Sequence, residues 1–196
     1  MKKIKFLSSG QSLIEAVFAI GILVMIASAI LALVSASISG QQESESQIIA
    51  NNLAREGIEA ARNIRDSNWL SNQDWDTGLI DSIGNSQRAV AWFNPDNGLA
   101  SWSFDFNLTP GKDLLFLSSA GVYSHLAQGN KPTNFSRQVI FENICRNDAT
   151  GQERITFPCA GGETKIGLKV SSQVSWHDQV NRPRQVTLQD LFYDWK

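Results

Sequence analysis

One carboxylate stands at the start of an uncharged apolar segment, and it is the residue best placed to do chemistry. Glu15 directly precedes 19 uncharged residues, Ala16–Val34. An ionisable group at bilayer depth costs about 2.5–3.5 kcal/mol at the helix centre, so its presence there indicates a function. Gly10 ends a short basic stretch just before this segment.

The two cysteines are the other residues whose spacing has a chemical consequence. Cys145 and Cys159 bound a segment of 15 residues. In an oxidising compartment a disulfide would close this loop and stabilise the fold by about 3 kcal/mol in the chain-entropy estimate. The alternative is two unpaired buried thiols. A redox or metal role is not expected, because the spacing is not C-x-x-C and no further ligands accompany it.

No arrangement typical of an enzyme is visible. His125 and His177 stand singly near turns, without a second ligand at metal spacing. Asp74–Gly78 is rich in carboxylates but lacks the closing glutamate of an EF-hand, and no nucleophile elbow or phosphate loop occurs. Six tryptophans are compatible with stacking on a ligand, but large aromatic side chains mostly pack in cores. We therefore expect no enzymatic activity, no cofactor and no metal.

The apolar run predicts one membrane-spanning helix. As a helix it measures roughly 28 Å, close to the hydrocarbon thickness of a bilayer. Lys2, Lys3 and Lys5 precede it, and Glu43 and Glu45 follow it. Positive charge favours the cytoplasmic side, so we expect a single pass through the cytoplasmic (inner) membrane with the N-terminus inside and the larger part of the chain outside.

The residues Ser9–Glu15, SGQSLIE, resemble the class III signal of type IV pilins and type II secretion pseudopilins. In that family a prepilin peptidase cuts a short basic leader after glycine, and a glutamate lies five residues into the mature chain. The resemblance covers about the first 65 residues. It implies cleavage after Gly10, Gln11 as the new N-terminus and Glu15 as the assembly residue. The sequence departs from the family at Gln11, where phenylalanine or another apolar residue is usual.

The resemblance implies a subunit that polymerises through its N-terminal helix into a type IV pilus or a secretion pseudopilus. The implied partners are prepilin peptidase, other pilin or pseudopilin subunits, the inner-membrane assembly platform and membrane lipid. The chain is longer than a compact major pilin needs, which favours a minor pilin or minor pseudopilin. Many pilins carry a disulfide near the C-terminus, in agreement with a bridge between Cys145 and Cys159. Loss of the leader takes the net charge from −2 to −5, so no direct nucleic-acid partner is expected.

Other interpretations of the N-terminus account for fewer features of its sequence. A secretory signal peptide would use a small-x-small site such as Val34–Ala36, but the apolar run is too long for its hydrophobic region. A simple signal anchor accounts for the length and the lysines but not for Gly10 and Glu15. For Glu15 itself, the alternative is a carboxylate that snorkels to the headgroup level without a partner. The runner-up function is a single-pass, membrane-anchored extracytoplasmic binding protein that does not polymerise.

Helical periodicity continues beyond the apolar run. Apolar and small residues recur three or four positions apart, with charged residues on the other faces. This stripe consists of Ile49, Leu53, Gly57, Ala60 or Ala61, and Ile64. We expect one helix that continues to about Arg65 and packs the stripe against the following domain.

The period changes to two after a segment of turn residues from Asp66 to Asn85. Strands are expected at residues 89–93, 102–108 and 114–117, from Val139, at 166–176 and from Val186, with the first two and the last two paired as hairpins. A helix packed on an antiparallel sheet is an α+β arrangement, which agrees with the ladle fold that the resemblance implies. The expected organisation is a cleaved leader at 1–10, a transmembrane and assembly helix at 11–65 and a β-rich head domain at 66–196.

Overall fold

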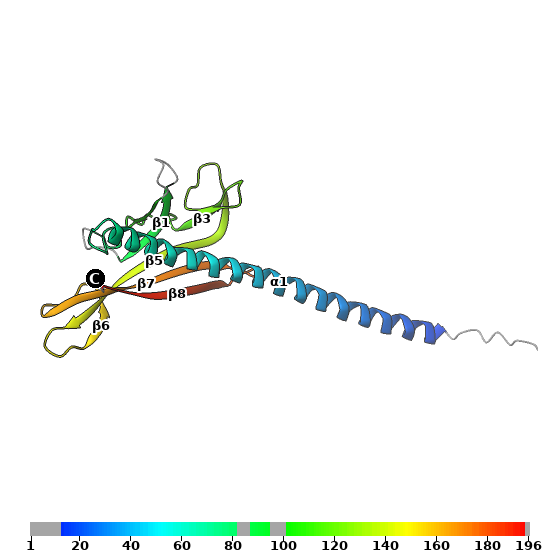
Figure 1. The fold of residues 1–196 in the computed structure, drawn as a ribbon. Helices are drawn as coiled ribbons and strands as arrows, with labels where there is room; N and C mark the ends of the chain where they lie inside the picture. The colour runs from blue at the N-terminus through cyan, green and yellow to red at the C-terminus, as the bar shows by residue number, and fades with distance from the viewer. Residues whose placement is uncertain (1–12, 82–86, 95–100, 195–196) are drawn as a thin grey trace, which may run out of the picture. The chain divides into compact units, whose positions relative to one another are not determined.

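The computed structural model describes residues 13–81, 87–94 and 101–194. The chain divides into two compact units, Met1–Ser44 and Glu45–Lys196. Helix α1, Leu13–Leu70, begins in the first unit and ends in the second (Figure 1). Within the described residues, eight strands follow it, so the expected α+β class is confirmed.

The first unit is described from Leu13 onward and consists of the apolar part of α1. Its large apolar side chains are exposed along the whole segment, from Leu13 to Ile38. The helix is long and apolar enough to cross a membrane, as the sequence predicts. Exposed apolar surface on this scale requires an apolar environment, such as lipid or other helices.

In the second unit, α1 buries a stripe of mostly small and apolar residues. The buried positions are Ala50, Leu53, Ala54, Gly57, Ile58, Ala60, Ala61 and Asn68. The predicted stripe is therefore confirmed at Leu53, Gly57, Ala60 and Ala61, while Ile49 and Ile64 are half-buried.

The helix ends at Leu70, five residues beyond the expected end at Arg65. Tertiary contacts of its last turn explain the difference. The buried Asn68 donates from Nδ2 to the carbonyls of Trp75 and Thr77, at 3.1 and 2.8 Å. The next residues then stop the helix, because Asn72 adopts a left-handed conformation with φ of 53°.

One long strand, β5, organises the sheet, in which every pairing is antiparallel. Along one edge β5 pairs with β7, and along the other it pairs in turn with β3, β1 and β6. β8 adds to β7, β2 to β1 and β4 to β3. The strands are β1 Arg88–Asn94, β2 Ser101–Asp105, β3 Leu114–Leu117, β4 Tyr123–Ser124, β5 Lys131–Asn147, β6 Glu153–Thr156, β7 Glu163–His177 and β8 Pro183–Tyr193.

Both expected hairpins, β1–β2 and β7–β8, are confirmed. β5 begins at Lys131, eight residues before Val139, where the sequence prediction begins its strand. β4 and β6 were not expected, because β4 has only two residues and β6 is largely exposed, so neither shows an alternating apolar pattern.

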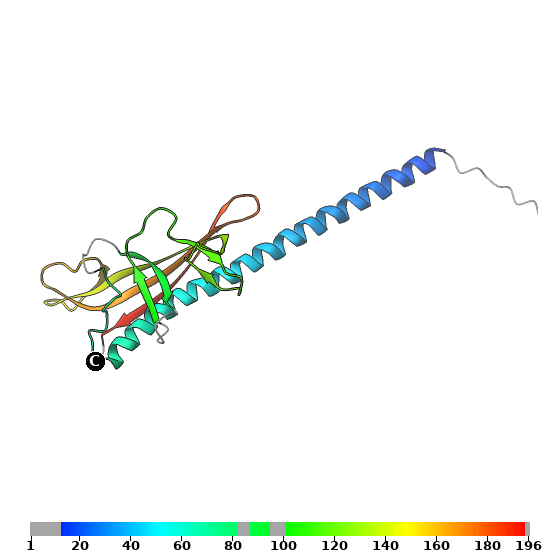
Figure 2. The ribbon, with the colours of Figure 1, turned by 90° about the horizontal axis from the view of Figure 1, so that it is seen from above.

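The core of the second unit lies between α1 and the sheet. Figure 2 shows this part of α1 lying along the sheet. Leu53 packs with Val174 of β7, and Ala61 packs with Phe141 of β5. The approach is close at Gly57, where an added Cβ would lie 2.4 Å from Ser172 Oγ. Glycine is therefore required at this crossing for steric reasons.

Candidate functional sites

The expected processing residues Gly10 and Gln11, with the rest of the leader at 1–10, lie outside the described residues. Glu15 is described and stands in the first turn of α1, where it is exposed. A carboxylate in this position interacts favourably with the helix dipole, by about 0.3–1 kcal/mol at an exposed site. Glu15 thus combines a favourable place in its own helix with a charge that is open to a cationic partner.

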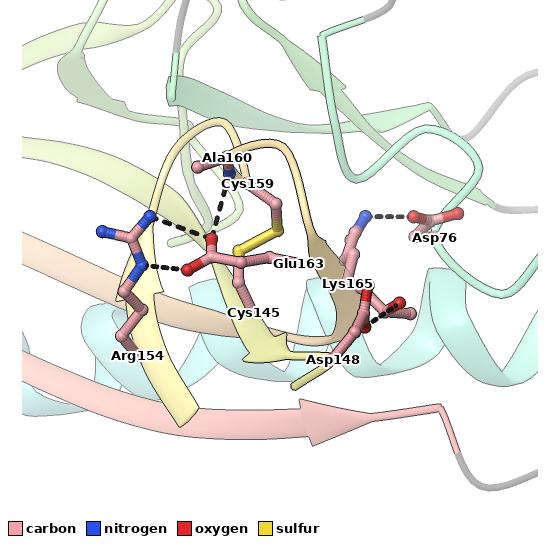
Figure 3. The surroundings of a disulfide bond; sticks show 9 residues. Asp76, Cys145, Asp148, Arg154, Cys159, Ala160, Glu163 and Lys165 are labelled. Carbon is pink, nitrogen blue, oxygen red and sulfur yellow. Dashed lines mark hydrogen bonds and ion pairs between the residues drawn. A yellow bond between two sulfur atoms is a disulfide. The ribbon is translucent and has the colours of Figure 1, made fainter. Parts of the chain in front are cut away.

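The predicted disulfide is present. Cys145, fully buried in β5, is bonded to Cys159 in the loop between β6 and β7, with the two Cα atoms 5.7 Å apart. Figure 3 shows the bridge from Cys159 in this loop to Cys145. Of the two interpretations of the cysteine pair, the bridge is correct and the unpaired thiols are excluded.

Ion pairs hold the chain around the bridge (Figure 3). Arg154 donates from Nε and Nη2 to the two carboxylate oxygens of Glu163, at 2.6 and 2.9 Å. The Arg154 hydrogen bond, together with one from the Ala160 N–H, lowers the pKa of Glu163. Lys165 pairs with Asp76, so the loop after α1 is tied to β7. These contacts indicate a structural role for the region.

A pocket of about 440 Å³ opens on the second unit, beside the β1–β2 hairpin. Most of its exposed wall is apolar. Its residues come from α1, from β1 and β2, from β5 and from the segment that contains β4: Glu56, Ala91, Trp92, Phe93, Trp102, Ser118, Val122, Tyr123, Ser124, His125, Leu126, Asn130 and Arg137. A smaller hollow adjoins it at Glu56, Val122 and Tyr123.

An ion pair between a buried guanidinium and a partly exposed carboxylate contributes to the lining of this pocket. The Arg137 side chain is only 2% exposed and donates from Nη1 to Glu56 Oε2 at 2.9 Å and to the Leu53 carbonyl at 3.2 Å. Burial lowers the pKa of Arg137, and the carboxylate of Glu56 opposes this shift. The Glu56 side chain is 36% exposed, so the pocket presents its carboxylate, which is ion-paired to the buried Arg137.

His125 is buried in the wall of the same pocket. Its Nδ1 lies 3.1 Å from the Leu114 carbonyl oxygen, and burial, helped by the charge of Arg137, lowers its pKa to about 4. The imidazole is therefore neutral at pH 7, and Nδ1 carries the proton that it shares with Leu114. His177, the other histidine, is exposed at the end of β7.

The carboxylate-rich segment Asp74–Gly78 packs against the sheet through Trp75 and Asp76. Trp75 is buried, with the Lys165 ammonium 5.3 Å from its ring centroid, and Asp76 pairs with that ammonium. Among the residues that the structure describes, no group of three histidine, cysteine or acidic side chains could hold a metal ion.

Sequence reasoning missed the pocket and its ion pair. The available signal is Arg137, which occupies an inward position of β5 between Phe135 and Val139, where the alternation calls for an apolar residue. A charge at such a position indicates a buried partner. The partner, Glu56, has no distinguishing mark among the other acids of the helix.

Comparisons with protein-family models, with curated proteins and with solved structures found no match for this chain.

Proposed function

We propose that the protein is a pilin-like subunit, a minor pilin or minor pseudopilin that is processed after Gly10 and assembled through α1. The observation that carries the proposal is the continuity of one helix with two different surfaces. Its first part is apolar and exposed, with Glu15 in the first turn, and its second part is packed on an antiparallel sheet. The sequence SGQSLIE, residues 9–15, includes the first three residues of this helix.

Assembly would depend on the positively charged amine that cleavage creates at the new N-terminus. Cleavage after Gly10 creates an amine at Gln11, four residues before Glu15, a separation that spans about 6 Å in an α-helix. In a filament of staggered helices, an incoming amine can pair instead with the Glu15 of a neighbouring subunit. Leaving one partner of such a pair alone in an apolar core costs about 3–5 kcal/mol. Any other stagger leaves both charges unpaired, so the pair sets the axial register.

The second unit supports an extracytoplasmic location. Its two cysteines form a disulfide, a bond that persists in oxidising compartments. This agrees with the positive charge of Lys2, Lys3 and Lys5 on the other side of the apolar helix.

Processing provides the test that separates this proposal from its alternative. On co-expression with a prepilin peptidase, the wild-type chain should lose its first ten residues, and mass spectrometry should find Gln11 at the new N-terminus. Gly10→Val should remain full-length, whereas the matched change Ser9→Ala should be cleaved normally. A wild-type chain that stays full-length would favour the membrane-anchored binding protein that does not polymerise. Cleavage of Gly10→Val at Gln11 would also contradict the assignment.

A further inference from the structure

The pocket beside the β1–β2 hairpin has the features of a ligand site. Its volume of about 440 Å³ lies within the usual range for small-molecule sites, about 300–1,000 Å³. Three large apolar side chains on its rim are exposed: Phe93 at 47%, Val122 at 59% and Leu126 at 50%. Exposed apolar residues that gather around a hollow, rather than scattering singly, indicate a binding surface.

Four aromatic side chains contribute to the lining of the pocket. Trp92 and Phe93 come from β1, Trp102 from β2 and Tyr123 from β4. The rings of Phe93 and Trp102 lie with centroids 5.1 Å apart and are inclined at 55°. The faces of such rings carry negative electrostatic potential, so they attract a cation placed within about 6 Å of a ring centroid.

The charged group that the pocket exposes is a carboxylate, which is ion-paired to a buried guanidinium. Glu56 is the acidic residue of the wall, and its side chain is 36% exposed. Arg137, the one basic residue among those that line the described pocket, is 2% exposed and already bonded to Glu56 and to the Leu53 carbonyl. His125 is neutral at pH 7, so it does not repel a cation.

Several polar groups of the rim already take part in hydrogen bonds of the fold. Ser118 and Ser124 accept hydrogen bonds from the backbone N–H groups of Val122 and Leu126, and the Asn130 amide donates to the Leu126 carbonyl. A primary ammonium brings three N–H donors that each need an acceptor. A fully methylated ammonium brings none and offers an apolar surface to the aromatic rings. The mostly apolar wall therefore suits the methylated cation better.

We propose that this pocket binds a methylated ammonium group of the kind that choline carries. The cation would lie against the aromatic rings with the Glu56 carboxylate beside it. The proposal does not depend on filament assembly, and it can hold or fail independently of the processing test. Free choline compounds and the headgroup of choline lipids share this chemistry.

Equilibrium dialysis of radiolabelled choline tests the proposal on the full chain in nanodiscs of phosphatidylethanolamine and phosphatidylglycerol, with empty nanodiscs as background. Unlabelled choline and tetramethylammonium should displace the label. The neutral isostere 3,3-dimethylbutan-1-ol, which has the same shape without the charge, should need at least tenfold higher concentration. Absence of choline binding, or equal displacement by the isostere, would overturn the proposal.

Variants locate the binding. Trp102→Leu keeps an apolar side chain but removes one aromatic face, and should weaken choline binding at least fivefold. Tyr193→Leu makes the matched change on β8, outside the pocket, and should leave binding unchanged. Glu56→Gln is not used here, because it also removes the partner of the buried Arg137 guanidinium and would destabilise the fold. Trp102→Leu is therefore the variant that tests the site. Equal binding by Trp102→Leu and the wild-type chain would overturn the assignment of the site.

A second nanodisc composition distinguishes the two sources of the cation. In phosphatidylcholine discs, a headgroup that reaches the pocket should compete with labelled choline and lower its apparent affinity. Unchanged affinity in those discs indicates that the pocket takes the free compound. Both results uphold recognition of the methylated ammonium, provided that Trp102→Leu weakens choline binding in the first composition.

Discussion

Arg137 of β5 donates from Nη1 to the Oε2 atom of Glu56 on α1, across 2.9 Å. The guanidinium is almost completely buried, and a second bond from the same nitrogen reaches the Leu53 carbonyl. Two residues 81 positions apart in the sequence thus join the helix to the central strand. Because burial disfavours the charge of Arg137, its stability in the fold depends on the carboxylate.

Glu56→Gln should lower the free energy of unfolding by about 3 kcal/mol, because it leaves a buried guanidinium without its counter-charge. Chemical denaturation followed by tryptophan fluorescence measures the change. Glu153→Gln is the matched control, since Glu153 pairs with Arg146 where both side chains are exposed. That change should cost less than about 1 kcal/mol. An equal decrease in the free energy of unfolding in the two variants would show that the pair of Arg137 and Glu56 stabilises the fold no more than an exposed pair does.

Gly57→Ala should destabilise the second unit, although alanine is the better helix former by about 1 kcal/mol. The added methyl group would lie 2.4 Å from Ser172 Oγ and 3.1 Å from Val139 Cγ2. Overpacking of this kind typically costs about 1–3 kcal/mol. Gly40→Ala adds the same group to the same helix in open space and should not lower the thermal midpoint. A Gly57→Ala chain as stable as the wild type would contradict the close crossing.

Reduction of the disulfide should lower the free energy of unfolding by about 3 kcal/mol, since the bond closes a loop of 15 residues. Denaturation curves of the oxidised and reduced chain measure the difference. Non-reducing digestion of protein purified from the envelope should recover one peptide pair that joins Cys145 to Cys159. Free alkylation of both thiols in that preparation would contradict an oxidised bridge in the native compartment.

Burial of His125 should make stability depend on pH. Its pKa falls from 6.5 to about 4 in the folded chain, mainly through burial. Between these values the unfolded chain binds more protons, so the free energy of unfolding falls as the pH falls from 6.5 to 4. This loss of stability is absent above pH 6.5 and reaches about 3 kcal/mol below pH 4.

His125→Gln should remove the pH dependence that His125 causes. As the pH falls from 6.5 to 4, the wild-type chain should therefore lose stability relative to the variant. Denaturation midpoints at closely spaced pH values give that difference and cancel the carboxylates that titrate in both proteins. A difference that stays constant with pH would show that His125 is not buried as a neutral group.

The sequence predicts most of the fold because its patterns are local. Nineteen uncharged residues, the stripe through Leu53 and Gly57, and the alternation in the last two strands each follow from one element alone. The end of α1 at Leu70 could not be predicted, because Asn68 is a turn-forming residue whose amide donates to two carbonyls of the loop that follows the helix. The pocket could not be predicted either, because its residues come from segments that only the folded sheet brings together.

The spacing of the two cysteines shows that a disulfide is possible, but only the structure shows that it forms. A 15-residue segment permits a bridge, and the structure places the two Cα atoms 5.7 Å apart. The partner of Glu15 is a different case, because the proposed amine belongs to another copy of the chain. No pattern within a single sequence fixes that contact.

Incorporation of Glu15→Ala into filaments tests the central claim most directly. The variant should insert into the membrane and be cleaved after Gly10 as the wild-type chain is, because neither step uses the carboxylate. Sheared filaments from cells that carry the assembly machinery should contain the wild-type subunit and lack the variant, as quantified by immunoblotting against the membrane fraction. Incorporation of Glu15→Ala at the wild-type level would contradict a register set by the Gln11 amine and Glu15.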